Sequence, residues 1–171
     1  MPLASVAFAD WLPFAVDIHV AVQLPSKPTE IDLAKLMPAA ARQHTRLWVL
    51  RAPEGVYMIM RLRAGNERIS QHDTAGRRNY YAGVMQAVLH DEQGQLITRS
   101  YFATPVGTGL EFKYKERHQS TGKQIVKYIR SLVVDSVGYS LNFIPTDAQD
   151  SLGIAGNDQR RRCFNSLVAT P

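Results

Sequence analysis

Positively charged residues gather in one stretch of the sequence, from Leu110 to Ser136. The first part alternates Phe112 and Tyr114 with Lys113 and Lys115, a period of two that is typical of a strand with one buried face. On such a strand the two lysines share the exposed face. Ammonium groups that line one face are suited to contact the phosphates of a nucleic acid.

A second basic stripe follows in the segment 120–136, which we expect to form a helix. Lys123, Lys127 and Arg130 are spaced i, i+4 and i+7, so on a helix they share one face. The opposite face is then largely apolar and carries Ile125, Ile129, Leu132, Val133 and Ser136. The basic strand and the basic helix together predict a surface that binds a polyanion. An ordinary solvated surface explains the same pattern equally well.

A third basic feature is the pair Arg77 and Arg78, in the polar segment 64–79. This segment contains few signals for a helix or strand, and we therefore expect a mobile loop. Tyr80 and Tyr81 follow directly. Exposed tyrosines beside arginines are what a groove for single-stranded nucleic acid needs, although rings in alternating strands usually lie in the core.

Motifs for nucleotide hydrolysis are incomplete. Gly122 and Lys123 have the order found at the end of a phosphate-binding loop, but Arg117 stands where its first glycine is needed and Gln124 where a serine or threonine is needed. The run Gly107-Thr108-Gly109 has no third glycine and precedes an expected strand. We interpret this run as a turn.

Residue types that ligate metals or attack substrates also lack the spacing that such chemistry needs. The five histidines include no pair at i and i+4, and Cys163 is the single cysteine, so an intramolecular disulfide cannot form. We therefore expect no catalytic residue, no metal and no cofactor. A single cysteine is typical of a reducing compartment, and we expect a cytoplasmic protein.

Composition predicts one domain over residues 1–171. Of these residues 45% are hydrophobic and 20% are charged, and no Pro-, Gly- or Ser-rich linker divides the chain. The formal charge of +5 fits a nucleic acid, an anionic membrane surface or an acidic protein as partner. An oligomer is left open. No apolar run approaches the roughly 18 residues that a membrane span needs.

Periodicity and turn residues predict the elements that position these side chains. We expect strands over 16–24, 46–51, 56–63, 80–89, 96–102, 110–115 and 139–144, and helices over 29–43, 120–136 and 158–167. In the first strand Ile18, Val20 and Val22 are predicted to be buried, and Pro38 should interrupt the first helix. Strands joined by hairpins predict an α+β domain with a largely antiparallel, curved sheet and about three helices covering one face.

Our leading hypothesis is a non-enzymatic binding module that contacts nucleic acid through its basic residues. The contact residues are predicted to be Lys113, Lys115, Lys123, Lys127, Arg130, Arg77 and Arg78.

Two other functions remain open. The first is a structural or adaptor component of a larger assembly, which meets an acidic protein through the same basic faces or docks through edge strands and the apolar residues Phe8, Trp11 and Phe14. The second is a small-ligand binder whose pocket lies between the sheet and the helices. Its predicted lining is Met58, Met60, Tyr80 and Met85.

Overall fold

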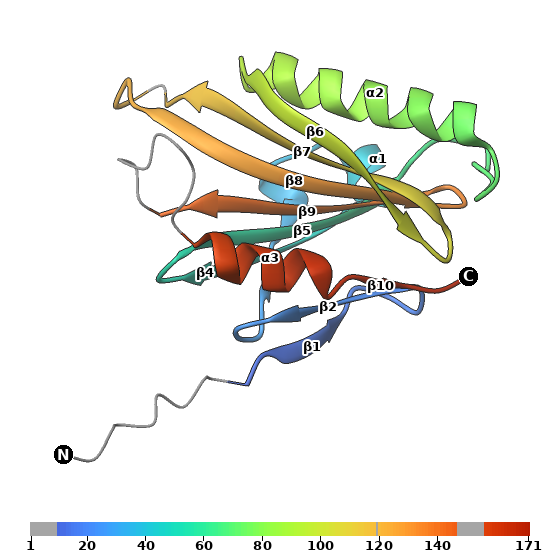
Figure 1. The fold of residues 1–171 in the computed structure, drawn as a ribbon, viewed down its shortest axis with the longest axis horizontal. Coiled ribbons are helices and arrows are strands. Elements are labelled where there is room, and N and C mark those ends of the chain that lie inside the picture. Colours follow the sequence, from blue (N-terminus) through green and yellow to red (C-terminus); the bar gives the residue numbers. More distant parts are fainter. Residues whose placement is uncertain (1–9, 119, 147–155) are drawn as a thin grey trace.

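Seven strands form one antiparallel sheet in the computed structural model, which describes residues 10–118, 120–146 and 156–171 (Figure 1). In spatial order these strands are β3 (Thr29–Glu30), β4 (Arg46–Ala52), β5 (Gly55–Arg63), β9 (Val137–Pro145), β8 (Gln124–Val134), β7 (Gly107–Arg117) and β6 (Gln95–Thr104). A second, small antiparallel sheet has the order β1 (Leu12–Ala15), β2 (Val20–Leu24) and β10 (Val168–Ala169).

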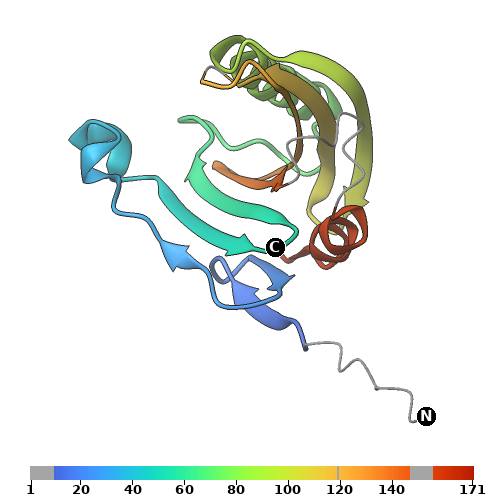
Figure 2. The same cartoon turned by 90° about the vertical axis from the view of Figure 1, so that its left-hand side faces the viewer.

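The helices lie on both faces of the seven-stranded sheet. They are α2 (Thr74–Asp91), α3 (Asn157–Asn165), the short α1 (Ala39–Arg42) and a single 3-10 turn, η1 (Leu33–Lys35). We call the face that carries α2 the inner face, and the face that carries α3 and the small sheet the outer face. Figure 2 shows the sheet curling, with α3 and the small sheet on the outside of the curl. Within the described residues, no helix is long and apolar enough to cross a membrane.

Each face of the sheet has its own hydrophobic core. On the inner face, Tyr81 and Met85 of α2 pack against residues of β7 and β8, namely Leu110, Phe112, Tyr114, Ile129 and Val133. On the outer face, β2 and α3 pack against the sheet through residues that include Val20, Val22, Leu24, Cys163, Phe164 and Leu132. Strand β8 therefore contributes to both cores.

Helix α2 is held to the sheet by two buried polar side chains. The Nε of Arg77 donates to the Thr108 carbonyl oxygen at 3.0 Å, and a terminal nitrogen donates to the Val133 carbonyl oxygen at 2.9 Å. The Tyr81 hydroxyl donates to the same Thr108 oxygen at 2.7 Å and accepts from the Val133 N–H at 3.1 Å. These four bonds join one turn of α2 to the start of β7 and the end of β8, and we call them the Arg77–Tyr81 latch.

The predicted helix over 120–136 is wrong, because most of this segment is strand β8. Val126, Tyr128 and Leu132 face the outer core, whereas Ile129 and Val133 face the inner core. A strand that is buried on both faces is apolar on both, so the alternation that identifies a half-exposed strand is absent. The spacing of Ile129, Leu132 and Val133 in the sequence is also the spacing of one face of a helix, which led to the wrong prediction.

The predicted strand over 80–89 is wrong, and the predicted loop over 64–79 is right only as far as residue 73. Both run into α2, whose N-terminus is capped by Asp73 through a 2.8 Å bond from the Gly76 N–H to its carboxylate. Arg77 is consequently 1% exposed in the core instead of lying on a mobile loop.

The predicted first strand starts four residues too early. Strand β2 begins at Val20, and the carboxylate of Asp17 accepts from the N–H groups of His19 and Val20 in a turn before it. Val20 and Val22 are buried as expected, but Ile18 is 88% exposed. The helix expected over 29–43 is replaced by β3, η1 and α1, with the expected interruption at Pro38.

The α+β class and the largely antiparallel sheet are confirmed. The hairpin of β4 and β5, the strands β7 and β9 and the helix α3 all lie where the sequence predicts them, within a few residues. One detail differs, because α2 and α3 cover opposite faces.

Tyr81→Phe tests the Arg77–Tyr81 latch. Loss of the hydroxyl leaves the buried Val133 N–H without its acceptor, and this should lower the free energy of unfolding by about 1–3 kcal/mol. Urea denaturation measures the loss. Tyr101→Phe is the matched control, since the Tyr101 side chain is exposed; equal losses in both variants would contradict a role for the latch.

Candidate binding groove on the inner face

The sheet is too wide for α2 to cover. Seven strands at a spacing of about 4.8 Å span about 29 Å, whereas a helix with its side chains is about 10–12 Å across. Helix α2 packs on β7 and β8. The inner side of β4, β5 and β9 is therefore reached by α2 only along its border, through side chains such as Tyr80 and Val88.

This half of the inner face is largely apolar, with Ser140 and Asn142 of β9 as polar exceptions. Residues that point to it from β4, β5 and β9 are only half-buried, and they include Leu47, Val49, Val56, Met58, Met60, Leu62 and Ile144. Their neighbours along the strands, such as Trp48 and Tyr57, point into the outer core and are buried. The outer core already stabilises these strands, so the apolar character of their inner side chains is not needed for folding. Exposed apolar surfaces of this kind often bind a partner.

A groove runs between α2 and this half of the sheet. Val88 and Asp91 form its wall on the α2 side, and Met58, Met60 and Ile144 lie along its floor. The cavity has a volume of about 190 Å³. We call it the inner groove.

A charged cluster borders the inner groove where α2 ends. The Nζ of Lys127, on the inner side of β8, lies 2.6 Å from a carboxylate oxygen of Glu92 and 2.6 Å from one of Glu116. Glu92 follows the last residue of α2, and Glu116 is near the end of β7. Three separate elements therefore bring one cation and two carboxyl groups together.

The pKa values of the two carboxyl groups are shifted in opposite directions. The pKa of Glu92 is lowered, chiefly by the hydrogen bond from Glu116 and further by Lys127. The pKa of Glu116 is raised, chiefly by burial and further by its hydrogen bond to Glu92. Burial opposes the charge of Lys127, but the two carboxyl groups outweigh it and raise its pKa. As the pH falls, Glu116 therefore takes up a proton before Glu92 does, while Lys127 stays charged.

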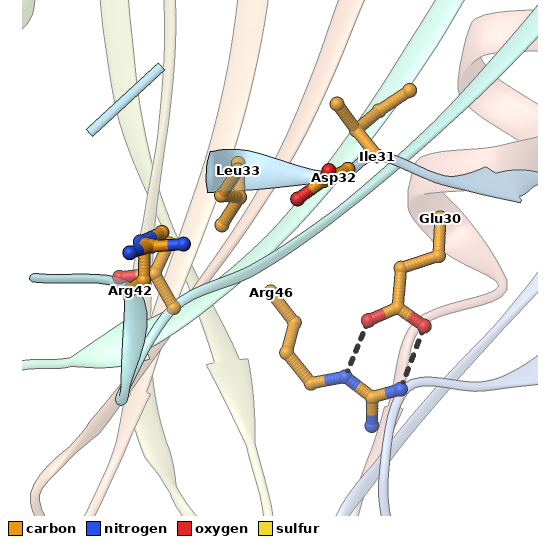
Figure 3. A pocket seen from close by; sticks show the side chains of 7 residues that line it. Glu30, Ile31, Asp32, Leu33, Arg42 and Arg46 are labelled. Carbon is orange, nitrogen blue, oxygen red and sulfur yellow. Dashed lines mark hydrogen bonds and ion pairs between the residues drawn. The ribbon is translucent and has the colours of Figure 1, made fainter. Parts of the chain in front are cut away.

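A second cleft lies near α1 and the strand β3, with a volume of about 410 Å³ (Figure 3). The guanidinium of Arg46 binds both carboxylate oxygens of Glu30 at 2.8 Å there, and the hydrogen bonds lower the pKa of Glu30. Arg42 and Asp32 add one further charge of each sign to the lining. Because its charges are balanced and its ion pair is exposed, this cleft is a weaker candidate than the inner groove.

The basic residues that the sequence singles out are divided between the two faces of the sheet. Lys113 and Lys115 lie on the outer side of β7, where the Nζ of Lys113 is 5.2 Å from the centre of the Tyr128 ring. Arg130 lies on the same side and pairs with Glu111 at 2.9 Å. Lys127 points to the inner side.

The other three basic residues are also separated. Lys123 is exposed in the turn before β8, and Arg77 is buried in the Arg77–Tyr81 latch. Arg78 is exposed on α2, with its guanidinium 5.9 Å from the centre of the Tyr101 ring. The seven residues thus do not form one continuous surface.

The predicted ligand pocket is partly in place. Met58 and Met60 line the inner groove, but Met85 is buried beneath α2. Tyr80 lies against β9, where its hydroxyl occupies the space that a side chain on Gly138 would need. The sequence contains no signal that would unite Glu92, Glu116 and Lys127, because they are brought together by strand pairing and the packing of α2.

Cys163 is buried in the outer core, and burial raises its pKa to about 12. The thiol is therefore protonated near neutral pH and acts as a small apolar side chain. Among the described residues, no three side chains of His, Cys, Asp or Glu gather closely enough to hold a metal ion.

Comparison with known proteins identifies only the fold. No family model and no curated protein sequence matches this chain. One similar solved structure is the PsbP protein of the cyanobacterium Synechocystis, with 8% identity and a TM-score of 0.60 over 99% of this chain and 98% of that one. A second is a putative regulator of unknown function from Pseudomonas aeruginosa, with 12% identity and a TM-score of 0.50 over 85% of this chain and 99% of that one. A third is the Ran-binding protein Mog1p of Saccharomyces cerevisiae, with 11% identity and a TM-score of 0.48 over 94% of this chain and 96% of that one.

Lys127→Met tests the charged cluster. In the unmodified protein the lowered pKa of Glu92 stabilises the fold above the ordinary pKa of a glutamate, and this contribution is lost as the pH falls. Without Lys127 the pKa of both carboxyl groups rises. The folded state of the variant therefore loses most stability at high pH, where both groups are ionised. We expect the free energy of unfolding to fall by about 1–3 kcal/mol near pH 7 and by clearly less near pH 4.

Urea denaturation at the two pH values measures this difference. The control is Lys123→Met, which removes an exposed lysine outside the cluster and should give the same stability as the unmodified protein at both values. An equal loss near pH 4 and pH 7 for Lys127→Met would show that the ion pairs do not stabilise the fold.

Proposed function

We propose that the protein is a non-enzymatic binding module that holds an amphipathic helix of a partner protein in its inner groove. The observation that carries this proposal is the largely apolar half of the inner face that α2 reaches only along its border. Half-exposed apolar side chains from three adjacent strands are typical of a surface that another protein covers.

The dimensions support a helix as the occupant. Three strands provide a width of about 14 Å, and two packed helices lie about 8–10 Å apart, so a helix fits over β4, β5 and β9 beside α2. A second helix would complete the layer that one helix leaves incomplete. The groove of about 190 Å³ is smaller than the roughly 300–1,000 Å³ of common small-ligand pockets, which makes the small-ligand hypothesis less favourable.

Backbone hydrogen bonding also favours a helix over an extended peptide as the occupant. The floor of the inner groove is mainly apolar and provides few partners for the N–H and C=O groups of an extended peptide. A helix satisfies these groups internally and presents apolar side chains to the floor. The occupant should therefore carry apolar residues at i, i+3 or i+4, and i+7.

The charged end of the inner groove favours a bound helix with a positive charge next to it. Asp91 is exposed at the rim, and the neighbouring Glu92 carries a carboxylate that Lys127 only partly covers. Carboxylates at a rim attract a lysine or arginine and set the orientation of a bound helix more than its affinity. We expect a basic residue at the end of the occupant that lies next to Asp91.

Methionine methyl signals in NMR spectra provide the direct test, with peptides selected from a library of amphipathic helices as the probe. Binding in the inner groove should shift the signals of Met58 and Met60. The signals of Met85, buried beneath α2, and of Met37, next to α1, should stay in place. Shifts confined to Met37, or no shifts with any selected peptide, would contradict the proposal.

Met60→Arg should weaken binding of the same peptides at least about tenfold, because it places a charge in the apolar floor. Fluorescence anisotropy of labelled peptides measures the affinity, and urea denaturation confirms that the variant is folded. Met37→Arg is the control and should bind as the unmodified protein does. If both variants bind equally well, the peptides occupy another surface.

Nucleic-acid binding remains the second candidate. The observation that favours it is the position of Lys113, Lys115 and Arg117 at alternate positions of β7, which puts all three on the outer side of one strand. Lys123, at the adjoining turn, would extend this row. Lys127 and Arg130 fit less well, because each is held in a close ion pair, and Arg77 is buried in the Arg77–Tyr81 latch.

Replacing Lys113 and Lys115 by alanine tests the second candidate. If each lysine contacts a phosphate, the slope of log affinity against log salt for a single-stranded oligonucleotide should decrease by about 0.7 per lost contact. Lys27→Ala, an exposed lysine after β2, is the control and should keep the slope of the unmodified protein. An unchanged slope in the folded double variant would exclude these lysines as phosphate contacts.

A further inference from the structure

The two edges of the seven-stranded sheet differ. At one edge, β3 has only two residues and pairs with the middle of β4. At the other edge, β6 has ten residues and pairs with β7 along one side only. Within the described residues, no backbone hydrogen bond outside the sheet involves β6. Its outer row of N–H and C=O groups is therefore available to another strand.

Most of β6 lacks the features that usually prevent edge-to-edge pairing. A register shift lies between Leu96 and Thr98, but the pairing from Thr98 to Thr104 is regular. This regular part has a single charged residue, Arg99, and the first proline comes after it. Exposed edges are normally protected by lysines, prolines or bulges along their length. Here Tyr101 is 45% exposed, and Ile97 beside the register shift is 41% exposed.

We propose that β6 pairs with β6 of a second copy of this chain, antiparallel and centred on Ser100. In this register Arg99 lies opposite Tyr101 of the second copy, on the inner side. The Tyr101 ring already accepts a guanidinium, since Arg78 lies 5.9 Å from its centre. The two-fold axis through Ser100 keeps the Arg99 residues of the two copies from facing each other. Each Arg99 thus faces an uncharged aromatic ring across the pair.

The helices on the inner face are compatible with this pairing. Helix α2 lies over β7, so three strand spacings, or about 14 Å, would separate the two copies of α2. Packed helices lie about 8–10 Å apart, and the two copies therefore do not collide. On α2, Arg78 faces β6, and Ala82 and Gln86 follow it at intervals of four on the same exposed side. None of these residues is acidic or large and apolar.

The interface is modest in size, and this sets its expected strength. Pairing through seven regular residues buries less than the roughly 1,200 Å² of a standard protein interface, so we expect a reversible dimer in the micromolar range. The pairing would join two sheets into one of fourteen strands and would leave both inner grooves open. It does not depend on the proposed helix binding.

Ser100→Cys tests the register directly. Residues that face each other across an antiparallel pair are close enough for a disulfide, and the native Cys163 is buried and unreactive. Mild oxidation should cross-link Ser100→Cys rapidly into a covalent dimer. Thr121→Cys, exposed at the turn between β7 and β8, is the control and should cross-link at least tenfold more slowly. Equal rates for the two variants would overturn the proposal.

Sedimentation equilibrium of the unmodified protein provides the second measurement. We expect a monomer–dimer equilibrium that Ser100→Lys weakens at least tenfold, because it places two like charges beside the two-fold axis. Met60→Arg, in the inner groove, should leave the equilibrium unchanged. A protein that stays monomeric at several hundred micromolar, or a dimer that only Met60→Arg disrupts, would overturn pairing through β6.

Discussion

The buried guanidinium of Arg77 determines where α2 lies and thereby which part of the sheet stays open. Its bonds to the carbonyl oxygens of Thr108 and Val133 join the helix to the two strands that it covers. A buried charge is tolerated only where such bonds are made, so α2 cannot slide along the sheet without a large cost in free energy. The inner groove exists because this one helix is held at one side of a sheet that is wide enough for two.

The outer face uses its basic residues in a similar way. Glu111 pairs with both Arg130 and Arg160, at 2.9 Å and 3.2 Å, and connects β7, β8 and α3. The guanidinium of Arg160 also stacks 4.2 Å from the centre of the Tyr128 ring. Among the described residues, Arg77 and Arg160 are buried and Arg130 is half-buried, so part of the positive charge lies inside the protein. The sequence pI of about 9.5 is consequently a poor measure of any basic surface.

Sequence patterns identify the strands that have one buried and one wetter face, such as β5 and β7, since alternation is visible there. They fail at β8, which is covered on both faces, and at α2, whose tyrosines, valines and glycines have low helix propensity. The latch and the packing of Tyr81 and Met85 override that propensity. Likewise, Met58 and Met60 are predictable as pocket residues from their strand. The cluster of Lys127, Glu92 and Glu116 depends on strand register and helix position, which no local pattern contains.

Affinity and selectivity should arise in different parts of the inner groove. Met58 and Met60 form a flexible, polarisable floor that adapts to many apolar surfaces and so discriminates weakly among them. The charged end is rigid by comparison, because Lys127 is held by two carboxyl groups, and its lowered pKa keeps Glu92 ionised. A bound helix with a basic residue there gains an ion pair, whereas one with an acidic residue meets a carboxylate. For the proposed function, we therefore expect selection among occupants to depend on this end more than on the apolar floor.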